Sequence, residues 1–196
     1  MSEWPGGREL LEKLLAPPPK LLFREAELNE ARAYIERGEP FKVVGPPGVG
    51  KTTLARMALI GVDHAYVSCF QRRTPRMILP LLDGERWNVL DDFSLAMWDE
   101  RLFSAVKRLS RVVLVELPHR RSPLLETRVI EMRPYSREQL EEILRERVVR
   151  LLLPADDDDI RRAAEEGARR GGNARVALLA LHQLVLPRIK RQQLPL

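Results

Sequence analysis

The sequence predicts an α/β fold, in which a five-stranded parallel sheet lies between helices, followed by a small helical domain. Short apolar segments alternate with segments of helical period between residues 24 and 132, and this alternation requires crossover connections and parallel strands. After Pro134, three segments of helical period follow one another with no strand between them. We therefore expect an N-terminal extension over residues 1–22, an α/β core over 23–133, and a helical domain with a basic tail over 134–196.

Individual residues mark the boundaries of several expected elements in the first two regions. The helix over 10–15 is ended by the prolines at 17–19, and Gly38 ends the helix over 24–37. The strand that begins at Trp87 ends in two carboxylates. Strands are expected over 41–45, 64–70, 87–92, 111–117 and 127–132, and further helices over 52–60, 75–82 and 95–109.

The last region is expected to hold helices over 136–153, 155–170 and 173–186. Ser136 followed by Gln139 fits a capping box. The four aspartates at 156–159 lie where the next helix should begin, and carboxylates are favoured at the positive end of a helix. Helix capping is therefore the preferred interpretation over an acidic binding site.

Composition limits the kinds of protein that this chain can be. Its 196 residues are 44% hydrophobic and 31% charged, which fits a globular chain. No apolar run approaches the roughly 20 residues that cross a bilayer, and the start lacks the features of a signal peptide, so we expect a cytoplasmic protein with no membrane partner. Cys69 is the single cysteine, which excludes an internal disulfide and a cysteine-based zinc site. The three histidines, His64, His119 and His182, lack metal-ligand spacing.

The strongest motif is GPPGVGKTT, which runs from Gly45 to Thr53. It fits the phosphate-loop pattern G-x-x-x-x-G-K-[ST], with a strand expected before it and a helix after it. Glycines let successive N–H groups converge on phosphate oxygens, and the helix adds its positive end. Lys51 can reach the β and γ phosphates, and the Thr52 hydroxyl can bind magnesium. The residues expected to bind ATP or ADP in this loop are Gly45, Pro46, Pro47, Gly48, Val49, Gly50, Lys51, Thr52 and Thr53.

Two carboxylates at the end of the strand over 87–92 complete the expected site. A nucleoside triphosphate site needs a carboxylate near the magnesium ion, and Asp91 is placed to supply it. Asp92 can orient or activate the attacking water. Enzymes of this type commonly have the longer glutamate there, so hydrolysis is either retained or slow with Asp92.

Several segments, taken in order, resemble the AAA+ ATPases. These are GPPGVGKTT, VLDDFS, RVIEMRPYSREQLEEILRERV and GGNARVALLAL, and the resemblance covers residues 23–186. Within AAA+ the chain looks most like the initiator clade, above all a minimal archaeal origin-recognition type without the winged-helix domain. The resemblance implies a helical lid over the nucleotide, and assembly in which one subunit completes the site of its neighbour.

The resemblance also implies roles for individual arginines. Arg175, in GGNAR, matches the lid arginine that contacts the γ-phosphate. Arg24 is the second residue of FREAELNEAR, which is similar to the segment that helps to hold the adenine. An arginine finger acting on a neighbour's phosphate would be Arg120, Arg121 or Arg128, and we prefer Arg121.

The chain also departs from the family pattern. The fourth strand lacks the polar residue that holds the attacking water, so either Glu116 or His119 substitutes for it or that function is absent. Only a short segment separates Cys69 from Asp91, which is too short for the DNA-contacting helical insertion of the initiator clade. Sequence-specific origin binding is therefore not expected.

The net charge is +5, and a basic segment over 101–128 together with the tail at 188–193 permits nonspecific, salt-sensitive contact with a DNA backbone.

The first hypothesis is an ATPase that acts as a nucleotide-gated loader or remodeller in DNA replication or repair. The second is an adaptor that binds ATP or ADP, hydrolyses little, and switches a partner protein. A small-metabolite kinase ranks third, because kinases of this size usually carry the lid between strands.

Overall fold

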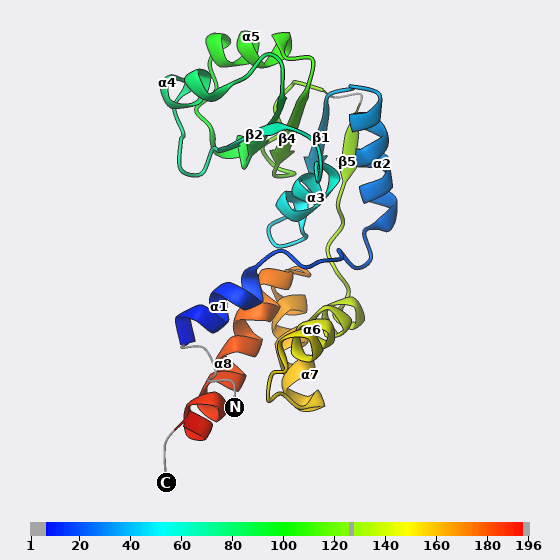
Figure 1. The fold of residues 1–196 in the computed structure, drawn as a ribbon, viewed down its shortest axis with the longest axis vertical. Helices are drawn as coiled ribbons and strands as arrows, with labels where there is room; N and C mark the ends of the chain where they lie inside the picture. The colour runs from blue at the N-terminus through cyan, green and yellow to red at the C-terminus, as the bar shows by residue number, and fades with distance from the viewer. Residues whose placement is uncertain (1–6, 126–127, 194–196) are drawn as a thin grey trace. The chain divides into compact units, whose positions relative to one another are not determined.

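The computed structural model describes residues 7–125 and 128–193 (Figure 1). Contacts divide the chain into an α/β unit, Arg24–Arg133, and a helical unit that combines the chain before Arg24 with the chain after Arg133. The chain therefore passes from one unit to the other twice. None of the helices in the described residues is both long and apolar enough to cross a membrane.

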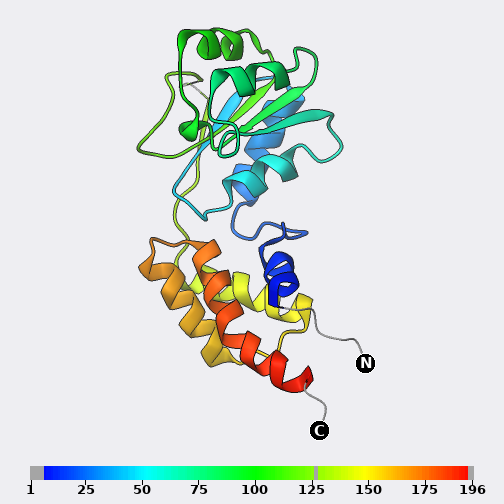
Figure 2. The same ribbon diagram turned by 90° about the vertical axis from the view of Figure 1, so that its left-hand side faces the viewer.

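The α/β unit contains the five-stranded parallel sheet that the sequence predicts, in the order β2-β3-β4-β1-β5. Figure 2 shows helices on both faces of this sheet, with α4 and α5 on one face and α2 and α3 on the other. Because both faces are covered, every residue of β1, β3 and β4 is buried. The strands are β1 Phe41–Val44, β2 His64–Ser68, β3 Trp87–Asp91, β4 Val112–Glu116 and β5 Val129–Glu131.

The helices of this unit are α2 Glu25–Glu36, α3 Lys51–Ala58, α4 Pro75–Ile78 and α5 Glu100–Arg108. The expected start of the last helix at residue 95 is wrong. Residues Phe93–Leu95 form a short 3-10 turn, and Ala96 is extended with ψ 150°. The helix begins after Asp99 because the Asp99 carboxylate accepts a hydrogen bond from the Leu102 N–H at 2.7 Å and caps it.

The helical unit consists of α1 Gly7–Leu15, α6 Arg137–Leu151, α7 Asp157–Arg169 and α8 Ala174–Gln193. Both expected caps are present, as reciprocal capping boxes of Ser136 with Gln139 and of Asp156 with Asp159. The side chains of Leu10 and Leu14 on α1 belong to the same buried cluster as residues of α6, α7 and α8.

The last helix is longer than the sequence suggests, since it continues through Pro187 rather than ending at residue 186. A proline inside a helix removes a hydrogen bond and crowds the preceding turn. Packing beyond the proline offsets this cost, because Ile189 is buried in the core of the unit and Arg188 forms ion pairs with Asp159 and Asp156.

Candidate functional site

The phosphate loop lies between β1 and α3, as the sequence predicts, and its glycines adopt conformations that other residues rarely reach. Gly48 has φ +76° and Gly50 has φ +93°, and Gly50 is the N-cap of α3. A Cβ atom on Gly45 would lie 2.6 Å from the Met132 carbonyl oxygen. Because side chains would clash or strain the backbone at these positions, the pattern of glycines is a steric requirement of the loop.

The Lys51 side chain lies along the loop that precedes it. Its ammonium group donates hydrogen bonds to the carbonyl oxygens of Gly45 at 2.7 Å and of Pro46 at 2.8 Å, and the residue is only 7% exposed. This places the charge of Lys51 beneath the turn whose backbone would surround a phosphate group.

Asp91 lies at the end of β3 and contacts the phosphate-loop helix. The Thr52 hydroxyl donates to the Asp91 Oδ1 atom at 2.8 Å, and the Asp91 side chain is buried. A hydroxyl oxygen beside a carboxylate suits Mg²⁺, which is usually held by one or two protein oxygens together with waters and substrate phosphates. Among the described residues there is no cluster of three His, Cys, Asp or Glu side chains for another metal ion.

Tyr66, on the edge strand β2, also binds this carboxylate, and the sequence did not reveal it. Its hydroxyl donates to the Asp91 Oδ2 atom, and the Arg56 guanidinium lies 4.3 Å from the centre of its ring. Burial and the neighbouring Asp91 carboxylate raise the pKa of Tyr66 to about 12, so the hydroxyl keeps its proton at neutral pH.

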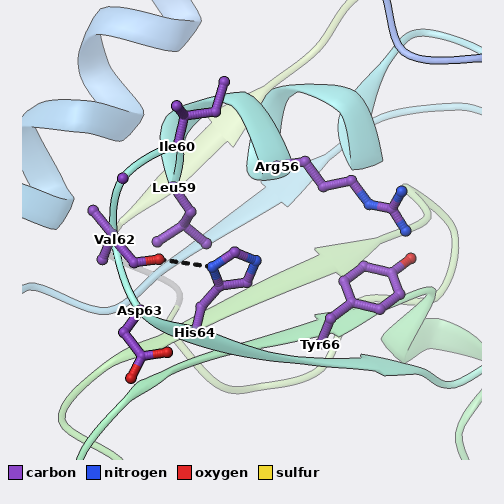
Figure 3. Close-up of a pocket in the computed structure, with 8 residues that line it drawn as sticks. Arg56, Leu59, Ile60, Val62, Asp63, His64 and Tyr66 are labelled. Carbon is purple, nitrogen blue, oxygen red and sulfur yellow. Dashed lines mark hydrogen bonds between the residues drawn. The ribbon is translucent and has the colours of Figure 1, made fainter.

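An open hollow of about 800 Å³ borders Tyr66 (Figure 3). Within it His64 Nδ1 lies 2.8 Å from the Val62 carbonyl oxygen, and Ile60 is 73% exposed. The hollow is lined by Arg56, Leu59, Ile60, Gly61, Val62, Asp63, His64 and Tyr66.

Asp92 follows Asp91 directly and has a left-handed backbone, with φ +53° and ψ +39°. A non-glycine residue in this region carries strain of about 1–3 kcal/mol. The following 3-10 turn supports the conformation, since the Leu95 N–H donates to the Asp92 carbonyl oxygen at 2.8 Å. The turn brings the second carboxylate to the same end of β3 as the first.

Glu116, the polar residue at the end of β4, contacts other residues of the protein. The Glu116 carboxylate is fully buried, lies 3.6 Å from the Lys42 ammonium group, and accepts from the Ser122 N–H at 3.1 Å and 3.2 Å. Lys42 in turn donates to the Ser122 carbonyl oxygen at 3.0 Å. Burial raises the pKa of Glu116, and its contacts with Ser122 and Lys42 oppose that rise. Glu116 thus fixes the loop after β4, while His119 is exposed.

The three candidate finger arginines each contact groups of their own unit. Arg120 lies over the Trp98 ring at 5.1 Å and donates to the Ala96 carbonyl oxygen. Arg121 pairs with Glu131 at 2.9 Å, and Arg128 lies 3.7 Å from Glu39.

The other two predicted arginines have different surroundings. Arg24 is 5% exposed, and it donates to Glu27 at 3.1 Å and to the Arg133 carbonyl oxygen at 2.5 Å. It therefore ties together the two places where the chain enters and leaves the α/β unit. Arg175 is exposed near the start of α8, and it makes no side-chain hydrogen bond or ion pair with the described residues.

The glycines before Arg175 have a steric role. Gly172 has φ +67°, and a Cβ atom there would lie 2.4 Å from the Tyr135 carbonyl oxygen. The Tyr135 N–H also donates to the Gly172 carbonyl oxygen at 3.3 Å. Gly172 therefore lets the chain pass close to the start of the lid before α8 begins.

No protein-family model matches the sequence, and no curated protein does. Solved structures, by contrast, resemble the fold closely. Cdc6p from Pyrobaculum aerophilum superposes with a TM-score of 0.74 at 18% identity, over 92% of this chain and 66% of that one. The Holliday junction branch migration motor RuvB of Thermotoga maritima gives 0.66 at 20% identity, over 91% and 68%. Drosophila ORC bound to DNA gives 0.69 at 18% identity, over 95% and 61%.

These likenesses show the fold: an α/β P-loop domain followed by a helical lid, as in Cdc6p, ORC and RuvB. The predicted fold class is thereby confirmed. The chain spans 66% of the length of Cdc6p and 61% of the matched ORC chain.

Proposed function

We propose that this chain, whose fold is that of an AAA+ ATPase, binds ATP with Mg²⁺ and acts as a nucleotide-gated loader or remodeller linked to DNA replication or repair. The observation that carries the proposal is the contact between Thr52 and Asp91 at 2.8 Å, directly after a phosphate loop with the required glycine conformations. Loop, lysine, hydroxyl and carboxylate come from three different elements, and together they match the needs of a triphosphate and its metal ion.

The phosphates are bound by the loop and its lysine. Backbone N–H groups between Gly45 and Thr53 surround the β-phosphate, and the N-terminal end of α3 adds its positive charge. When the nucleotide binds, the Lys51 ammonium group leaves the carbonyl oxygens of Gly45 and Pro46 and binds phosphate oxygens instead. Its present contacts already hold it against the phosphate loop. Thr52 and Asp91 would hold Mg²⁺, which would supply positive charge against the phosphates.

Hydrolysis depends on three further side chains. Asp92 orients the attacking water or accepts its proton, and the guanidinium of Arg175 stabilises charge on the γ-phosphate. Arg121 of one subunit acts on the phosphate of its neighbour, which requires that it leave Glu131. Arg24 contributes to holding the adenine.

DNA contact rests on charge. The segment over 101–128 carries seven arginine or lysine residues and two glutamates. One of those glutamates, Glu116, is buried against Lys42 and does not reduce the positive charge of the surface. Binding to the phosphate backbone should therefore be nonspecific and weaken with salt.

One observation favours the adaptor as a second candidate. In many hydrolytic sites a polar group on the fourth strand holds the water, and here the polar group at that place, Glu116, is bound to Lys42 and Ser122. Asp92 is also shorter than the usual glutamate. An adaptor would bind ATP or ADP and switch a partner with little turnover.

ATP turnover decides between the two, measured for the wild type, Lys51→Ala and Asp92→Asn, each alone and with duplex or single-stranded DNA. The matched control is Lys13→Ala, an exposed lysine on α1 in the helical unit. The loader hypothesis predicts turnover that DNA stimulates and that both site substitutions abolish. Tight ATP binding that depends on Lys51, without ATP turnover, would support the adaptor hypothesis and exclude the loader. ATP binding that Lys51→Ala does not weaken would overturn both.

A further inference from the structure

We propose that Tyr66 is a positioning residue for the metal site: its hydroxyl fixes the Asp91 carboxylate in the orientation that lets Asp91 and Thr52 hold Mg²⁺ together. The inference rests on the proposed function, because it assigns a role within the same nucleotide site. Tyr66 contacts neither the nucleotide nor the reacting atoms in this scheme, and it acts only through Asp91.

Three contacts link four side chains in a series that begins and ends on helix α3. Thr52 donates to one oxygen of Asp91 at 2.8 Å, and Tyr66 donates to the other. Arg56 covers the Tyr66 ring at 4.3 Å, as Figure 3 shows. Arg56 lies four residues after Thr52 on α3, hence on the same side of that helix. The series of contacts thus starts on α3, passes through β3 and β2, and returns to α3.

Strand register explains how Tyr66 reaches the carboxylate. Ser68 on β2 pairs with Asp91 on β3, and Tyr66 pairs with Val89. Side chains two residues apart on a strand lie on the same face. Tyr66, Ser68 and Asp91 therefore share one face of the sheet, and the length of a tyrosine side chain spans the offset of two residues to reach Asp91.

Fixing both oxygens has a chemical consequence. An aspartate bound only through one oxygen can turn about its terminal torsion, which has broad minima. With Tyr66 on Oδ2, the Oδ1 atom stays directed at Thr52, where the metal ligands must meet. Side chains that orient metal ligands in this way commonly change metal affinity about 10–100-fold when removed.

The test is Tyr66→Phe, which removes the hydroxyl and keeps the ring beneath Arg56. Tyr66 is 36% exposed and borders the hollow beside α3, so the substitution leaves no large buried cavity. The matched control is Tyr34→Phe, because the Tyr34 hydroxyl donates to exposed Glu30 at 3.3 Å on α2. Thermal unfolding of both variants checks that each is folded.

ATP affinity is measured as a function of Mg²⁺ concentration and again in excess EDTA. We expect Tyr66→Phe to raise the Mg²⁺ concentration at half-maximal effect by about 10-fold, with unchanged ATP affinity in EDTA. Arg56→Leu, which removes the cation over the ring, should shift it in the same direction by less. Tyr34→Phe should match the wild type.

The outcomes separate this inference from the proposed function. A Tyr66→Phe variant whose Mg²⁺ dependence equals that of Tyr34→Phe overturns the positioning role alone. Equal losses of affinity with and without Mg²⁺ also overturn it, because they indicate a general structural defect. The proposed function is overturned, and this inference with it, if Mg²⁺ does not change ATP binding by the wild type and Lys51→Ala binds ATP as tightly as the wild type.

Discussion

Asp91 is the residue at which the contacts of the site meet. Its two carboxylate oxygens accept from Thr52 and Tyr66, and its carbonyl oxygen accepts from the Cys69 N–H at 2.8 Å. Contacts within the protein thus fix both the side chain and the backbone of Asp91. Pre-arranged ligands reduce the cost of ordering a metal site when the metal arrives.

Cys69 gives a prediction about reactivity. Burial, with the charges of Asp91 and Asp92, raises the pKa of Cys69 to about 12. Because the thiolate is the reactive form, a higher pKa leaves less of it at pH 8. We expect native Cys69 to react with a disulfide reagent about 1,000-fold more slowly than the unfolded chain. Stopped-flow absorbance with and without denaturant measures both rates, and comparable rates would contradict the buried placement.

Lys42 gives a prediction about pH. Burial raises the pKa of Glu116 from 4.5, and Lys42 opposes this rise. A raised pKa means that the stability contributed by the group is complete below pH 4.5 and is lost as pH rises through the folded value. Lys42→Met raises that pKa further and leaves the Glu116 charge unpaired, so it should cost about 3–5 kcal/mol near pH 7 and much less near pH 4.

Urea unfolding of Lys42→Met and the wild type across this pH range tests the pair. The double variant Lys42→Met/Glu116→Leu is the control, because it removes both charges and should recover most of the stability at pH 7. A cost that does not change with pH would show that Glu116 stays ionised throughout.

Secondary structure elements differ in how well the sequence predicts them. The strands were predictable because parallel strands covered on both faces are apolar throughout, as β4 is. The expected strands ended one or two residues later than the strands of the structure, because hydrogen bonding to the neighbouring strand, and not apolarity, decides where a strand ends. The helix ends at Asp99 and beyond Pro187 depended on a side-chain cap and on long-range packing, which local patterns do not contain.

The candidate site shows the same division. Phosphate-loop residues and Asp91 were predictable, since a motif and a strand end determine them. Tyr66 was not, because its partner is set by the register of β2 against β3. The alternation of the strand places Tyr66 on the face of Ser68, but nothing in the sequence pairs Ser68 with Asp91.

Helix α6 gives a prediction about capping. The Ser136 hydroxyl accepts from the Gln139 N–H at 3.2 Å, and the Ser136 N–H donates to the Gln139 Oε1 atom at 3.0 Å. Ser136→Ala should therefore lower the unfolding free energy of the helical unit by about 1 kcal/mol. Ser104→Ala, on the exposed side of α5, should be neutral or slightly stabilising. Chemical unfolding followed by circular dichroism compares them, and equal effects would rule out a capping role.

At the scale of the whole molecule, α1 packs with the helices that follow Pro134 in one compact unit. The ring Nε2 atom of His182 on α8 lies 2.8 Å from the Gly7 carbonyl oxygen on α1, and this contact joins the two helices. Leu14 is fully buried in the lid core, whereas the adjacent Leu15 is 40% exposed. These neighbouring leucines form a matched pair for mutation.

Leu14→Ala should destabilise the helical unit by about 2–5 kcal/mol, because it removes buried apolar volume. Leu15→Ala should cost far less. Hydrogen exchange read along the chain locates the effect, and the loss of protection is expected in α1, α7 and α8. Protection lost equally in both variants would mean that α1 does not pack as described.

The joining of α1 to α8 also affects how the protein is made. Chains fold as they leave the ribosome, N-terminal segments first. The α/β unit is continuous in sequence and can form as soon as it emerges, but α1 must wait until α8 has been synthesised. During that interval Leu10 and Leu14 have no permanent partner, and the exposed apolar side of α1 is open to chaperones or to association with other nascent chains.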